Sequence, residues 1–102
     1  MKVIKDIAKN VQEEIHDADK YAWLAVRSKA DHPELADLYS RLANGEIEHA
    51  NMLHKQAVDI IERYRREGHE PPVAMKAVWD WEHERYIEEM ADVRRVLDMY
   101  RS

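Results

Sequence analysis

Apolar residues recur every third or fourth position along most of the chain, which is the period of one face of an α-helix. Between residues 3 and about 29 this pattern comprises Ile4, Ile7, Ala8, Val11, Ile15, Ala18, Ala22 and Ala25. A second run comprises Leu35, Leu38, Tyr39, Leu42, Leu53, Ala57, Ile60 and Tyr64, and a third comprises Met75, Val78, Trp79, Tyr86, Met90, Val93 and Leu97. The pattern predicts three long helices, each of which turns one apolar stripe toward a common core.

Two short breaks separate the expected helices. In the first, Asp31 can cap a new helix, Pro33 suits its first turn, and Glu34 stands three residues after the cap as a capping-box partner. In the second, Gly68 suits the left-handed position after a helix, and two prolines follow it. Because the first break is so short, we expect the first two helices to form an antiparallel hairpin.

The composition predicts an all-α protein with a single helical domain that spans residues 1–102. The chain has two glycines, three prolines and no phenylalanine, and it is rich in residues that favour helices. Three helices leave one apolar groove uncovered, because the stripe of each helix must be buried against a neighbour. We therefore expect the protein to be a homo-oligomer, at least a dimer.

The charge and the absence of cysteine exclude several classes of function. The net charge of −5 is spread along the chain without a long basic stripe, so nucleic acid is not an expected partner. No apolar run approaches the roughly 20 residues of a membrane helix, and no signal-peptide core is present, so we expect a cytoplasmic protein without a membrane partner. No small-molecule substrate is indicated. With no cysteine, any metal must be held by carboxylates and imidazoles.

Two ionisable residues interrupt the apolar stripe of the second helix. Glu46 and His49 lie between Leu42 and Leu53 near the centre of that stripe, so we expect both side chains to point into the core. A buried carboxylate costs several kcal/mol unless it is protonated, hydrogen-bonded, ion-paired or bound to a cation. Residues three apart share a helix face, so one oxygen of Glu46 and one nitrogen of His49 can reach the same ion.

A third ionisable residue, Glu14, interrupts the stripe of the first helix in the same way. It lies 17 residues before Asp31, and Glu46 lies 15 residues after Asp31, so an antiparallel hairpin brings the two carboxylates to nearly the same height. This match in height favours a metal site over a structural polar cluster.

The third helix offers weaker candidates for the same site. Glu82 and His83 flank its apolar stripe between Trp79 and Tyr86. A hydrogen-bonded core histidine is the simpler interpretation of His83, and both residues stay candidate metal ligands. The remaining histidines fall on outer faces or at corners and are expected to be solvated; they are His16, His32, His54 and His69.

The segment Glu46-Ile47-Glu48-His49-Ala50-Asn51-Met52-Leu53, with Glu14 on the preceding helix, resembles the first two helices of the ferritin-like superfamily, which includes rubrerythrins and ferritins. The resemblance covers roughly residues 4 to 65. Proteins of that superfamily bind two bridged iron ions inside a four-helix bundle through glutamates and Glu-x-x-His pairs. The resemblance implies a di-iron carboxylate site with ferroxidase activity or a role in oxidative stress, in which Glu46 bridges the ions and Glu14 and His49 are terminal ligands. Manganese or zinc would also suit these donors.

The sequence contains only half of the superfamily's ligand set, because Glu46 and His49 form its one Glu-x-x-His pair that interrupts an apolar stripe. The other pair with this spacing, Glu13 and His16, falls on an outer face that we expect to be solvated. Two chains could pair across a two-fold axis and supply Glu14, Glu46 and His49 twice, as in the encapsulated ferritins. Alternatively, the third helix could add Glu82 or His83 within one chain. We favour the dimer, because symmetry doubles the half-site and completes a four-helix-bundle-like site. The rival hypothesis is a metal-free interaction module in which the same residues form a buried hydrogen-bonded network.

Overall fold

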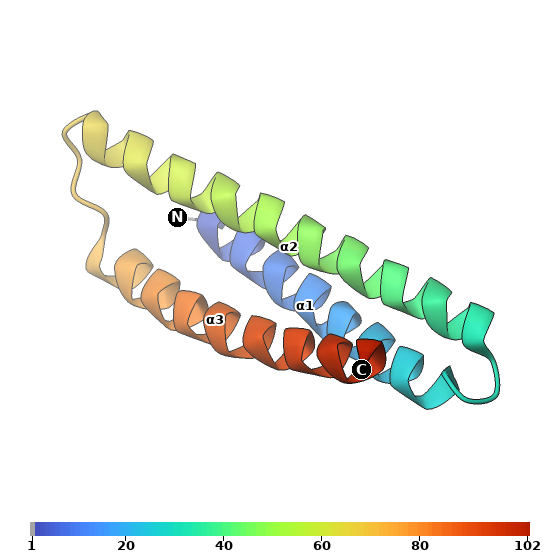
Figure 1. Ribbon diagram of the computed structural model, residues 1–102. Coiled ribbons are helices and arrows are strands. Elements are labelled where there is room, and N and C mark those ends of the chain that lie inside the picture. The colour runs from blue at the N-terminus through green and yellow to red at the C-terminus, as the bar shows by residue number, and fades with distance from the viewer. Residues whose placement is uncertain (1) are drawn as a thin grey trace.

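The computed structural model describes residues 2–102, which contain three α-helices and no strand (Figure 1). Helix α1 spans Lys2–Ser28, α2 spans Pro33–Arg66 and α3 spans Val73–Arg101. The predicted all-α class is therefore confirmed, and residue 1 of the predicted domain lies outside the described residues. None of the described helices combines the length and the apolar character that a membrane span requires.

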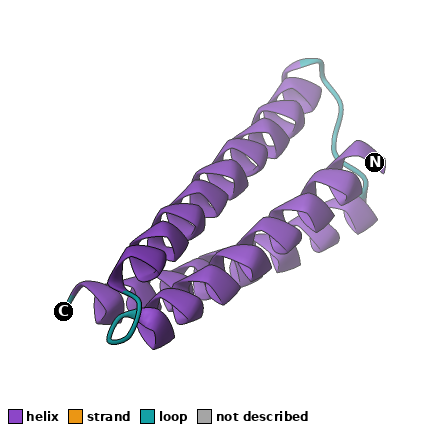
Figure 2. Ribbon diagram, turned by 90° about the vertical axis from the view of Figure 1, so that its right-hand side faces the viewer, coloured by secondary structure: helices purple, strands orange, loops and turns teal. Residues whose placement is uncertain are grey.

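The three helices run up, down and up along one axis, and the described residues form a rod of 57 × 19 × 17 Å. The loop between α1 and α2 lies at one end of the rod, and the loop between α2 and α3 lies at the other (Figure 2). Helix α1 packs against both other helices, whereas α2 and α3 touch each other only over a short stretch. The antiparallel α1/α2 hairpin is thus the main packing unit, as the short first break predicts.

Small side chains dominate the contact between α1 and α2. Alanines at helical spacing on both helices are fully buried, and they include Ala18, Ala22, Ala25, Ala36, Ala43, Ala50 and Ala57. Because alanine has no atoms beyond Cβ, the two backbones can approach closely, since the separation of packed helices follows the size of the side chains between them. Larger residues fill the rest of the core; those most deeply buried are Ile4, Ile15, Val93, Val96 and Leu97.

The orientation of α2 differs from the sequence prediction. Its buried row is Ala36, Ser40, Ala43, Ile47, Ala50, Ala57 and Ile61. Leu35, Leu38 and Leu42, which we expected in the core, keep 40%, 50% and 39% of their surface exposed. Helix α2 carries two adjacent apolar stripes, and the alanine stripe faces α1 because it allows the closer approach of the two helices. The predicted burial of these leucines is therefore wrong.

The exposed leucines belong to a surface that we call the open face of the hairpin. We define it by Leu35, Leu38 and Leu42 together with Tyr21 and Tyr39, whose rings stack across α1 and α2 with centroids 6.2 Å apart. Helix α3 reaches α2 through Asn51 and His54 instead. Leu42 and Asn51 are nine residues apart, which is about 180° around a helix. The open face therefore lies on the side of α2 away from α3.

The helix ends follow the sequence only in part. Gly68 has a φ of 84°, as predicted for the left-handed residue after α2. The N-cap of α2 is His32 rather than Asp31, and no side chain makes a capping hydrogen bond, so the predicted capping box is wrong. Pro33 occupies the start of the helix as expected, because its missing N–H group costs nothing there.

Lys29 ties the hairpin corner to the end of α3. Its Nζ donates hydrogen bonds to the carbonyl oxygens of Tyr100 at 2.6 Å and Ser102 at 2.8 Å. A cation at this position satisfies carbonyls that have no partner within the helix and opposes the negative end of the helix dipole. The contact fixes the C-terminal end of α3 beside the end of α1.

Substitution of Ala22 by leucine tests the close approach of α1 and α2. We expect Ala22→Leu to lower the free energy of unfolding by about 1 to 3 kcal/mol, because the added atoms overpack the contact. Ala91, which is exposed on α3, provides the matched control, and Ala91→Leu should leave stability nearly unchanged. Urea denaturation measures both, and an Ala22→Leu midpoint equal to that of the parent would contradict the close packing.

Candidate metal centre

Glu14 on α1 meets Glu46 and His49 on α2 at one point of the hairpin. One potential ligand atom from each of the three side chains lies within 4.8 Å of the other two. His49 Nδ1 is 3.7 Å from Glu14 Oε2 and 3.9 Å from Glu46 Oε2. The antiparallel hairpin therefore brings together the three residues that the sequence pattern singles out, at the shared height that residue counting gives.

This cluster lies at the protein surface and not in the core. The side chain of His49 is 58% exposed, and those of Glu14 and Glu46 are 29% and 21% exposed. The expectation that Glu46 and His49 point into the core is therefore wrong. Both residues do share the leucine stripe of α2, but that stripe is the open face, and no helix among residues 2–102 covers it. The cluster sits where a second molecule would have to complete its burial.

The donor set suits a divalent transition metal. Cations of this kind hold oxygen and nitrogen ligands at about 2.0 to 2.2 Å, so two atoms on one ion lie no more than about 4.4 Å apart. The two separations from His49 Nδ1, 3.7 and 3.9 Å, fall within this limit, and the ligand atoms of Glu14 and Glu46 lie within 4.8 Å of each other. Two carboxylates would balance the charge of the ion, and neutral His49 would add a nitrogen ligand. Three donors fill about half of an octahedral shell, so the site needs further ligands.

Glu82 lies apart from this cluster. Its Oε2 atom is buried without a hydrogen-bond partner, as is the Nε2 atom of Gln12 on α1. Burial raises the pKa of Glu82, and the nearby Arg85 opposes the shift. Glu82 belongs to no group of three potential ligands among residues 2–102. The structure thus places this carboxylate in the α1/α3 contact, where burial makes its charged form less favourable than in water.

His83 also lies apart from Glu14, Glu46 and His49. Its Nδ1 atom is 3.0 Å from Nε2 of His54, across the α2/α3 contact. His54 is half-buried and stacks on Tyr86 with ring centroids 4.2 Å apart, so the expectation that it is solvated is wrong. The sequence carried a usable signal, because position 54 continues the three- and four-residue spacing of the buried row that includes Ala50 and Ala57.

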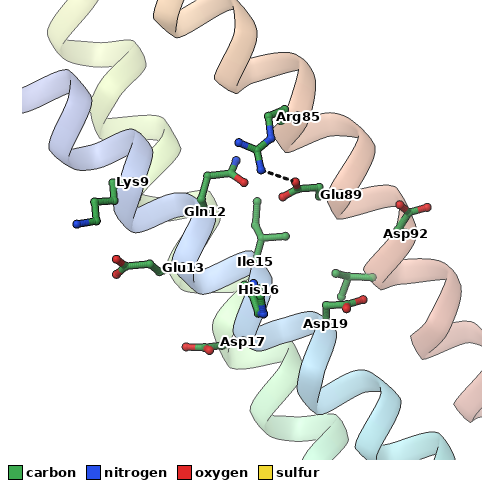
Figure 3. A pocket seen from close by; sticks show the side chains of 11 residues that line it. Lys9, Gln12, Glu13, Ile15, His16, Asp17, Asp19, Arg85, Glu89 and Asp92 are labelled. Carbon is green, nitrogen blue, oxygen red and sulfur yellow. Dashed lines mark hydrogen bonds and ion pairs between the residues drawn. The ribbon is translucent and has the colours of Figure 1, made fainter.

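A polar groove runs between α1 and α3 (Figure 3). Carboxylates from both helices line it, and Arg85 forms an ion pair with Glu89 at 3.1 Å. In the described part of the chain, Glu14, Glu46 and His49 are the one group of three whose ligand atoms converge, so the groove offers no comparable metal site. Its charges are those of a solvated helix surface.

Comparison with models of protein families, with curated proteins and with solved structures finds no match for this chain. The resemblance to the ferritin-like superfamily therefore rests on Glu14, Glu46 and His49 and on the helical hairpin that carries them. The function has to be argued from the chemistry of these residues.

The raised pKa of Glu82 predicts a pH-dependent loss of stability. The folded chain holds the proton more tightly than the unfolded chain, so this group destabilises the fold as the pH rises through its unfolded value. We expect Glu82→Gln to raise the melting temperature at pH 7 and to change it little below about pH 4, where the parent carboxyl is also neutral. Glu88→Gln, at an exposed position of α3, should show no such pH-dependent gain. A Glu82→Gln variant that melts at or below the parent temperature at pH 7 would contradict this assignment.

Proposed function

We propose that the protein binds a divalent transition metal through Glu14, Glu46 and His49, and that two copies pair through their open faces to form one di-iron carboxylate centre. The observation that carries the proposal is the position of the cluster. Three ligand atoms converge on the face of the hairpin where large apolar side chains are left exposed. A surface of this kind marks a contact site, and here the contact would include the metal ligands.

A second copy of the chain would both bury the exposed leucines of the open face and complete its set of metal ligands. Leu35, Leu38 and Leu42 are exposed and would be buried against their symmetry equivalents. In a two-fold dimer the same surface serves both partners, so each ligand on one side of the axis is repeated on the other. The three donors of one chain become six, and two hairpins form a bundle of four helices.

The residues of the chain have separate roles in this proposal. Glu46 would bridge two ions, while Glu14 and His49 would each bind one of them. Bound iron would supply electrons for the reduction of oxygen or peroxide, which is the chemistry of a ferroxidase or of protection against oxidative stress. The two carboxylates would supply negative charge to the site, and His49 would supply a nitrogen ligand. Leu42 and its symmetry equivalent would limit the access of water to the site. Manganese or zinc fits the same donors.

The positions of Glu82 and His83 support completion by a second copy. Glu82 faces Gln12 on α1, and His83 pairs with His54 on the side of α2 away from the open face. Neither joins Glu14, Glu46 and His49 in the group of converging ligands. The metal-free network is the competing function, because His49 lies close enough to both carboxylates to form ion pairs when it is protonated.

Thermal melting with and without Fe(II), under anaerobic conditions, separates these functions. A ligand that binds only the folded state raises stability by about 2.7 kcal/mol at a hundredfold excess over its Kd. We expect Fe(II) to raise the melting temperature of the parent, and Glu46→Ala to abolish this gain because it removes a ligand. Glu48→Ala, on an exposed position two residues away, is the matched control and should keep the full gain.

A second pair of variants tests the role of the dimer in the same melt. Leu42→Glu places a charge on the open face, so we expect monomers in sedimentation and most of the Fe(II) gain to be lost. Ile87→Glu on α3 changes a residue that is also exposed, and it should keep both the dimer and the gain. A parent that shows no Fe(II) gain, or a Glu46→Ala variant that responds like the parent, would favour the metal-free module.

A further inference from the structure

A second polar cluster joins α2 to α3 on the side of the hairpin away from the open face. His54 and Asn51 come from α2, and His83, Tyr86 and Trp79 come from α3. The hydroxyl group of Tyr86 donates a hydrogen bond to Oδ1 of Asn51, and the ring of His54 lies against those of Tyr86 and Trp79 with centroids 4.2 and 5.1 Å apart. These contacts form the short stretch in which α2 and α3 touch.

The two imidazoles of this cluster face each other through ring nitrogens. His54 Nε2 and His83 Nδ1 are 3.0 Å apart, and the rings are inclined by 26°. Two nitrogens at about 2.0 to 2.1 Å from one ion, with bond angles of about 90° to 110°, lie roughly 2.8 to 3.4 Å from each other. The observed separation therefore suits two ligands on a single ion as well as it suits a hydrogen bond.

The surroundings hold both rings in place before any ion binds. The rings of Tyr86 and Trp79, both on α3, pack against the ring of His54. His83 lies on the same helix, and its ring is close to that of Trp79. Side chains that need not be ordered on binding lose less conformational entropy, which favours affinity. Burial, followed by the proximity of His83, lowers the pKa of His54, and this shift favours the neutral ring that metal binding requires.

We propose that His54 and His83 form a second metal site, which binds a zinc-type divalent cation and clamps α3 onto α2. Imidazole nitrogen is a favoured ligand of zinc, copper and nickel, and water would complete the coordination shell. The site is separate from Glu14, Glu46 and His49. His49 and His54 are five residues apart, which is about 140° around α2 and about 7.5 Å along it.

The proton balance of the site is simple. Without an ion, one ring donates its N–H group to the other, so one of the two facing nitrogens carries a proton. Binding requires both facing nitrogens to offer lone pairs, and the donor ring then carries its proton on the opposite nitrogen. Both rings stay neutral and no proton is released. The proton that lay between the rings moves to the opposite nitrogen of the donor ring, and the cation takes its place.

Zinc titration followed by calorimetry tests the site. The Glu46→Ala chain serves as the reference protein, because the substitution removes a ligand of the other cluster and leaves the α2/α3 contact intact. We expect this protein to bind one Zn²⁺ per chain, and we expect His54→Gln or His83→Gln added to it to weaken binding at least about tenfold. His16→Gln, at an exposed position of α1, is the matched control and should leave the affinity unchanged.

A spectroscopic measurement on the unsubstituted chain avoids any effect of the substitutions on folding. In histidine ¹⁵N spectra, Zn²⁺ should shift the signals of His54 Nε2 and His83 Nδ1 together. The proposal is overturned if Zn²⁺ at saturation of the protein leaves these two signals unchanged, which would identify a hydrogen-bonded pair only. It is also overturned if the His54→Gln and His83→Gln proteins bind Zn²⁺ as tightly as the reference protein. Because different residues form the two sites, failure here leaves the proposal for Glu14, Glu46 and His49 intact.

Discussion

The close packing of α1 against α2 is the constraint on which the rest of the structure depends. Fully buried alanines line this contact, so the rotation of α2 is set by its small residues and not by its leucines. That rotation brings Glu46 and His49 to the edge of the contact, within reach of Glu14. It also leaves Leu35, Leu38 and Leu42 on a surface that α3 does not cover. The rotation of α2 therefore accounts both for the position of the candidate site and for the exposure of the open face.

The sequence predicts the three helices and their ends to within a few residues, because apolar periodicity and Gly68 are local signals. It also predicts that Glu14 meets Glu46, because counting from a short corner fixes heights along two antiparallel helices. It does not predict which stripe of α2 is buried. Leucine is the more hydrophobic residue, yet the alanine stripe is preferred because it permits closer contact, and that preference depends on the alanines of α1. His54 was misplaced for the same reason, since it belongs to the alanine stripe.

Helix α2 carries polar clusters on two sides, and each side has a different neighbour. On one side His54 meets His83, so α3 closes that side within the chain. On the other side Glu14, Glu46 and His49 remain partly exposed beside leucines. In our account the second side is closed by another copy, so one helix would take part in both the fold of the monomer and the assembly of the dimer. The third helix stabilises the hairpin and leaves the open face free.

Anomalous X-ray diffraction from crystals grown anaerobically with Fe(II) tests the central claim most directly. At the iron absorption edge, our account predicts two peaks close together on either side of a two-fold axis. Each peak should have carboxylate oxygens and a histidine nitrogen from Glu14, Glu46 and His49 of the paired chains as ligands. Crystals in which the open faces are in contact with solvent, and in which no iron lies near these residues, would contradict the account.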